Sequence, residues 1–126
     1  MKDNVYIDSE NFQLSLHIER FDNDAQGLLH VNVISNMVSA NAEMEVSLKD
    51  YEKFVESIQE MHQNLCGETI IAEPYGDKQF LKLIMDNHTG HVSVNGELAS
   101  RFNGHTQYVS IENEFDQSSL NCTRDD

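Results

Sequence analysis

The hydrophobic pattern of the chain changes its period at Ser47. Residues 38–46 alternate apolar and polar side chains, the pattern of a half-buried strand, and form the longest such run in the sequence. From Leu48 the apolar residues instead follow a helical stripe, with most of the acids beside it. The stripe consists of Tyr51, Phe54, Val55, Ile58, Met61 and Leu65. This change predicts a strand followed at once by an amphipathic helix that must bury its aromatic stripe against a sheet.

The expected helix spans residues 48–66. Ser47 can cap its first turn, and Asp50 suits the positive end of the helix dipole. Gly67, just after Cys66, is a candidate for the left-handed residue that ends the helix. At about 1.5 Å per residue such a helix is roughly 28 Å long, enough to cross a sheet.

Two period-two runs before the helix predict a hairpin. Residues 12–18 and 29–33 alternate apolar and polar side chains, and the polar segment 22–27 separates them. We expect that segment to be the connecting loop. The small residues Ala40 and Ala42 in the next strand indicate that something packs closely there.

Further hairpins are expected after the helix. Residues 69–72 and 79–85 flank a turn at residues 74–76, and the second of these runs is apolar on both faces, as in a central strand. A later hairpin is expected to end in residues 108–115. Asn103-Gly104 is favoured as its turn over Asn95-Gly96, because the alternation from Val92 keeps its phase through Gly96.

These patterns predict an α+β fold, in which one long helix packs on an antiparallel sheet of about six to seven strands. The length suits one domain over residues 1–126, and no window is apolar enough for a membrane helix. The acidic first residues lack the features of a secretory signal, so we expect a cytoplasmic protein. Cys66 and Cys122 are too few for a disulfide framework and are expected to be free thiols.

The charge is strongly one-sided, with 22 acidic and 8 basic residues and a net charge of −14. The acids are spread along the chain and the bases do not cluster, which argues against binding to nucleic acid. Two interpretations stay open: a surface that only keeps the protein in solution, and a field that accelerates encounter with a basic protein.

Metal and cofactor motifs are weak or incomplete, and we expect no metal or cofactor. His88 and His91 lie near a turn but lack a recognised ligand spacing. Residues 22–27 copy the start of a calcium loop, yet Val33 stands where the bidentate glutamate belongs.

Catalytic motifs are equally absent from the sequence: there is no nucleophile elbow and no phosphate-binding glycine loop. The carboxylate pairs at spacing two are Glu43 with Glu45 and Glu112 with Glu114. Such pairs are typical of the wet face of a half-exposed strand. We therefore expect a protein-binding function instead of an enzyme, with these rows of carboxylates as candidate contacts for a basic partner.

The order of elements and two short motifs resemble the WapI-type immunity proteins. The motifs are Gly90-His91-Val92-Ser93-Val94 and Phe115-Asp116-Gln117-Ser118-Ser119-Leu120. The resemblance implies a bacterial cytoplasmic protein that binds and neutralises the toxic domain of a polymorphic toxin, often a nuclease.

The leading hypothesis is thus an immunity-type inhibitor whose surface acids meet a basic toxin domain. The candidate partner-binding residues are Glu43, Glu45, Glu112, Glu114 and Asp116. Asp116 and Gln117 have an alternative role as a structural cap at the end of the last strand. Two other functions stay open: an acidic regulatory module with another partner, and a metal-dependent enzyme.

Overall fold

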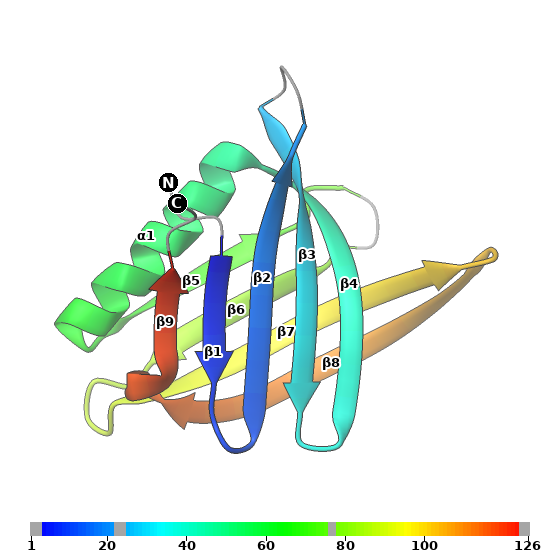
Figure 1. The fold of residues 1–126 in the computed structure, drawn as a ribbon. Helices are drawn as coiled ribbons and strands as arrows, with labels where there is room; N and C mark the ends of the chain where they lie inside the picture. Colours follow the sequence, from blue (N-terminus) through cyan, green and yellow to red (C-terminus); the bar gives the residue numbers. More distant parts are fainter. Residues whose placement is uncertain (1–3, 22–24, 76–77, 124–126) are drawn as a thin grey trace.

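The computed structural model describes residues 4–21, 25–75 and 78–123 (Figure 1). Along the chain its elements are β1 (Asn4–Asp8), β2 (Phe12–Arg20), β3 (Gln26–Ser35), β4 (Val38–Ser47), α1 (Leu48–Asn64), β5 (Gly67–Ala72), β6 (Phe80–Met85), β7 (His91–Phe102), β8 (His105–Asp116), the 3-10 helix η1 (Gln117–Ser119) and β9 (Leu120–Thr123).

The strands form two antiparallel sheets. One has the order β4-β3-β2-β1-β9 and the other the order β5-β6-β7-β8. The predicted α+β class and antiparallel pairing are confirmed, but the expected single sheet of six to seven strands is wrong. The four strands before α1 together with β9 build one sheet, and β5–β8 build the other. Each sheet has one apolar face, and the two apolar faces bury each other.

Strands β1 and β9 were not predicted from the sequence. Strand β1 buries only Val5 and Ile7, which is too short an alternation to stand out. Strand β9 pairs with β1, with Ile7 opposite Leu120. This pairing joins residues from the two ends of the described chain, so no local pattern reveals it.

The core lies between the sheets. The ring of Phe12 in β2 stacks on that of Phe115 in β8, with centroids 5.6 Å apart. Both side chains are buried, as are the inward-facing apolar residues of β3, β6 and β7 around them. Stacked aromatic side chains and alternating strand residues thus hold the two sheets face to face.

Helix α1 runs beside the sheets and packs mainly against β5, with further contacts to β4 and β9 (Figure 1). Five residues of its predicted stripe are buried, namely Tyr51, Phe54, Val55, Ile58 and Met61. The Ser47 hydroxyl accepts a hydrogen bond from the Asp50 N–H at 3.0 Å, which confirms the predicted cap. The helix ends at Asn64, two residues earlier than expected. Leu65, and not Gly67, takes the left-handed helical conformation there, with φ 56°.

The predicted hairpins β2–β3, β5–β6 and β7–β8 are confirmed. Asn103 and Gly104 form the β7–β8 turn, both with positive φ, as a two-residue hairpin turn requires. Gly96 continues β7, where an added Cβ would lie 2.7 Å from Leu81 Cδ2. Close strand packing therefore explains this glycine. The loop residues 22–24 and Gly76 of the predicted β5–β6 turn lie outside the described residues.

Candidate functional site

The five candidate acids are divided between the two sheets. Glu43 and Glu45 point outward from β4, between the buried residues of that strand. Glu112, Glu114 and Asp116 are exposed on β8, at the edge of the other sheet. The structure therefore brings the first two together and separates them from the other three.

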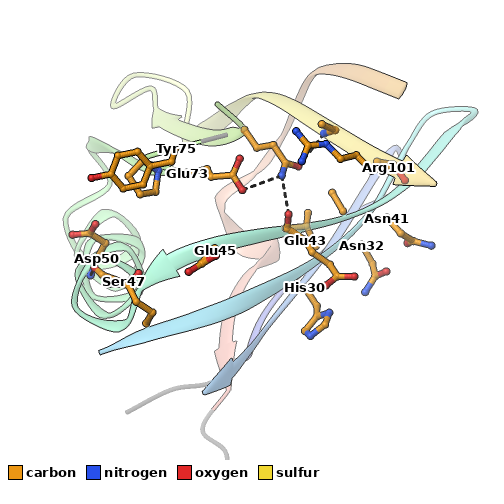
Figure 2. A pocket seen from close by; sticks show the side chains of 17 residues that line it. His30, Asn32, Asn41, Glu43, Glu45, Ser47, Asp50, Glu73, Tyr75 and Arg101 are labelled. Atoms are coloured by element: carbon orange, nitrogen blue, oxygen red, sulfur yellow. Dashed lines mark hydrogen bonds between the residues drawn. The ribbon is translucent and has the colours of Figure 1, made fainter. Parts of the chain in front are cut away.

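A groove of about 990 Å³ runs along β4 and contains Glu43 and Glu45 (Figure 2). Its opposite wall comes from the segment after β5 and from the far end of β7. It is lined by Gln26, His30, Val31, Asn32, Asn41, Ala42, Glu43, Glu45, Ser47, Asp50, Glu73, Pro74, Tyr75, Gln79, Ala99, Ser100 and Arg101. The two sheets and the start of the helix thus all contribute to one concave, polar surface.

Gln79 connects the two walls of the groove. Its side-chain Nε2 donates to the Glu43 backbone carbonyl at 2.7 Å and to Glu73 Oε2 at 3.4 Å. Its Oε1 accepts the Ala99 backbone N–H at 2.9 Å. Gln79 is 3% exposed, so one amide satisfies backbone groups of both sheets where direct strand pairing between them is missing.

Carboxylates dominate the charge of the groove. Glu43, Glu45, Asp50 and Glu73 line it together with one arginine, Arg101. Within the described part of the chain, no hydrogen bond or ion pair engages the side chains of Glu43 and Glu45. Glu73 Oε1 is buried and likewise lacks a hydrogen-bond donor among the described residues. Acceptors in a concave surface favour an ammonium or guanidinium group of a ligand.

Two histidines lie side by side on the outer face of the first sheet. His17 and His30 are cross-strand neighbours with ring centroids 6.2 Å apart. The His17 ring contacts Asn4 Oδ1 at 2.8 Å, and His30 Nε2 lies 3.3 Å from Glu19 Oε1. His30 also lines the groove next to Glu43, so this cluster borders the acidic surface.

The histidines considered as metal ligands have other neighbours. His91 Nδ1 lies 2.6 Å from Glu114 Oε1, across the β7–β8 pair. The His88 backbone N–H donates to Asp86 Oδ1 at 2.8 Å, and this hydrogen bond lowers the pKa of the Asp86 carboxyl. Over the described residues, no group of three or more His, Cys, Asp or Glu side chains is placed to hold a metal ion.

Asp116 has a structural contact. Its Oδ1 accepts the Ser118 N–H at 2.9 Å and caps the 3-10 helix η1. This hydrogen bond lowers the pKa of the Asp116 carboxyl, and the nearby His91 acts in the same direction. The geometry matches the alternative role of an end-cap considered from the sequence.

The sequence analysis identifies only Glu43 and Glu45 among the four carboxylates that line the groove. The sequence patterns indicate only a helix-dipole role for Asp50 and a turn position for Tyr75, and they give Glu73 no role. Gln79 was expected to begin a strand, which starts instead at Phe80. The available signal was a polar residue at the end of an apolar run, and such a residue needs a partner once it is buried.

Two further expectations concern the thiols and the membrane. Cys66 is free and exposed. The side chain of Cys122 lies outside the described part of the chain. Among the described residues, no helix combines the length and the apolar character needed to cross a bilayer.

Comparison with protein-family models, with curated proteins and with solved structures found no match to this chain.

Proposed function

We propose that this protein is a cytoplasmic, non-enzymatic binding protein that receives a basic segment of a protein partner in the groove along β4. The observation that carries the proposal is the set of four carboxylates, Glu43, Glu45, Asp50 and Glu73, in one concave surface between the two sheets. Charge complementarity of this kind steers encounter and selects partners of opposite sign. The net charge of −14 adds a long-range attraction in the same direction.

The specific form of the proposal is an immunity-type inhibitor that neutralises a basic, polymorphic toxin domain such as a nuclease. It is supported by the sequence motifs of β7 and of residues 115–120 and by the acidic groove. A nuclease cleft that grips phosphates carries lysine and arginine, and carboxylates placed in that cleft occupy the position of the anionic substrate. In this proposal Glu43 and Glu45 are the contact residues, while Asp116 serves the stability of η1.

Capture from native cells with matched variants tests the groove. The wild-type protein is immobilised at low salt beside the Glu43→Gln/Glu45→Gln double variant and a Glu112→Gln/Glu114→Gln control with the same change of charge. We expect the wild type and the control to retain one basic protein that elutes with salt. The groove variant should bind the purified partner about tenfold more weakly or worse, equivalent to ~1.4 kcal/mol. Equal binding by both double variants would exclude the groove as the contact surface.

Co-expression then distinguishes an immunity protein from a regulatory module. If the captured partner is toxic when expressed alone, the wild-type protein should restore growth and the groove variant should restore it less well. A partner that is harmless alone contradicts the immunity role and leaves a binding module for another purpose.

A further inference from the structure

The β7–β8 hairpin ends in a segment that contains no buried residue. Residues 100–108, which we call the arm, are all exposed or half-buried, and the hairpin projects beyond the two sheets (Figure 1). Phe102 is 78% exposed and Tyr108 is 67% exposed. A two-stranded ribbon in water is marginally stable, and a third strand or a packed face is what normally stabilises it.

The free edge of the arm presents unpaired backbone groups. In a hairpin closed by the pair Phe102 and His105, every second residue bonds across the ladder. Thr106, Tyr108 and Ser110 are the intervening residues, so their N–H and C=O groups point away from β7. The hydrogen bond of the Ala99 N–H supports this alternation. Ala99 is paired with Tyr108, and its N–H points away from β8 and donates to Gln79 Oε1.

Other sheet edges have features that discourage strand addition. On β4, the Gln79 side chain already donates a hydrogen bond to the Glu43 carbonyl, and the charged Glu43 and Glu45 side chains lie along this edge strand. Strand β9 has four residues, and β5 is packed against α1. Further along β8, the Asn113 side chain takes the Glu114 N–H at 2.8 Å. The arm has neither a lysine nor a proline, and no element in the described part of the chain covers it; these are the usual protections of an edge strand.

Charge identifies the occupant of this edge. Residues 98–111 contain no aspartate or glutamate, and Arg101 is their only lysine or arginine. Two copies with a net charge of −14 repel each other over most of their surface, and the arm is a long edge where they meet without opposing carboxylates. A basic partner, in contrast, finds no acid there to attract it.

We infer that two copies of the protein associate through their arms, by antiparallel pairing of β8 with β8 about a two-fold axis at Tyr108. Tyr108 of one copy then lies opposite Tyr108 of the other, and Thr106 opposite Ser110. These residues all direct backbone groups to the free edge, so the register satisfies both strands. The β5-β6-β7-β8 sheet of one copy and that of the other become one continuous sheet. The arm of each copy thereby gains the third strand that it lacks.

The inference does not rest on the proposed groove function, and salt separates the two. Binding of a basic partner weakens as salt rises, whereas pairing of two acidic copies strengthens because salt screens their repulsion.

Sedimentation velocity over ~1 to ~300 µM protein, at about 0.05 and 0.5 M NaCl, tests the pairing. Two variants address the axis: Tyr108→Pro removes an outward N–H, and Tyr108→Lys brings two ammonium groups together there. Met37→Lys is the control, because Met37 is 99% exposed, lies away from the arm in the β3–β4 turn, and undergoes the same change of charge.

We expect the wild type and Met37→Lys to form dimers that tighten with salt, and both Tyr108 variants to dissociate at least about tenfold more readily. Circular dichroism verifies that each variant is folded, and the lysine variant decides the result if the proline variant is not. A wild type that stays monomeric at every concentration and salt overturns the inference. So does a dimer that a folded Tyr108 variant leaves unchanged.

Discussion

Gln79 shows how one side chain joins the two sheets. Its amide accepts from the Ala99 N–H and donates to the Glu43 carbonyl, in a place where no strand of either sheet supplies these bonds. A neutral amide suits the site because it can donate and accept at once. These hydrogen bonds join the β4 side of the groove to the β7 side.

Replacing Gln79 with alanine is expected to lower the free energy of unfolding by about 1–3 kcal/mol, because a buried N–H and a buried C=O lose their partners. Urea denaturation measures the change. Gln13→Ala is the matched control, since Gln13 makes an exposed hydrogen bond to Asp8, and its effect should stay within about 0.5 kcal/mol. Equal effects of the two substitutions would show that Gln79 is not a bridge between the sheets.

Asp116 makes the stability of the η1 region depend on pH. The Ser118 N–H holds the pKa of this carboxyl below its ordinary value of 3.8. A lowered pKa means that the charged form stabilises the fold at pH values above 3.8, and that this contribution is lost as the pH falls through the lower folded value.

Asp116→Ala should therefore destabilise the protein at pH 7, and its difference from the wild type should shrink below pH 3.8. Unfolding curves at several pH values give this difference. Asp116→Asn keeps an acceptor oxygen without the charge, so its loss of stability at pH 7 should be smaller than that of the alanine variant. A difference between wild type and alanine variant that is constant with pH contradicts the assigned cap.

The residue that follows the last turn of α1 has an unfavourable backbone conformation. Leu65 adopts φ 56°, a left-handed conformation in which its Cβ crowds the following carbonyl. The sequence suggested Gly67 as the terminator because glycine accepts that conformation without strain. Met61 is the last buried residue of the helix, so a longer helix would bury no further apolar side chain, and the chain turns before Gly67.

Leu65→Gly should raise the free energy of unfolding by up to about 1 kcal/mol, since glycine removes the steric strain and the lost side chain is already 46% exposed. Asn64→Gly, one residue earlier and still helical, is the control and should lower stability by a similar amount. Thermal unfolding of both variants decides the matter. A loss of stability in both would mean that Leu65 contributes more by packing than it costs in strain.

At the scale of the whole molecule, the unbalanced charge opposes the compact state. A net charge of −14 on 126 residues brings carboxylates closer on folding than they are in the unfolded chain. Their repulsion is screened by salt, with a Debye length that falls from about 30 Å at 0.01 M to about 3 Å at 1 M.

Raising NaCl from about 0.02 to 0.5 M should therefore raise the unfolding temperature by a few degrees, roughly 4 °C for each 1 kcal/mol gained. Dilute protein keeps self-association out of the measurement. Replacing the exposed pair Glu52 and Glu56 by glutamine relieves part of the repulsion in α1, so that variant should gain less from salt. An unchanged or falling melting temperature would indicate that the acids do not oppose folding.

Local sequence patterns predict the features that depend on neighbours in the chain. Each of these features arises within a few residues and can be predicted from local sequence. They are the alternation over β4, the helical stripe of α1, the Ser47 cap and the Asn103-Gly104 turn. The acidic character and the candidate carboxylates of β4 and β8 are also identified from the sequence.

The way these elements meet depends on contacts between distant parts of the chain. These contacts split the strands into two sheets, pair β9 with β1, and place Glu43 and Glu45 in a groove with Glu73 but apart from Glu112 and Glu114. The physical reason is that periodicity states which face of a strand is apolar, and not which other apolar face covers it. That choice is made by packing between residues far apart in the chain, and the groove and the projecting arm are its consequences.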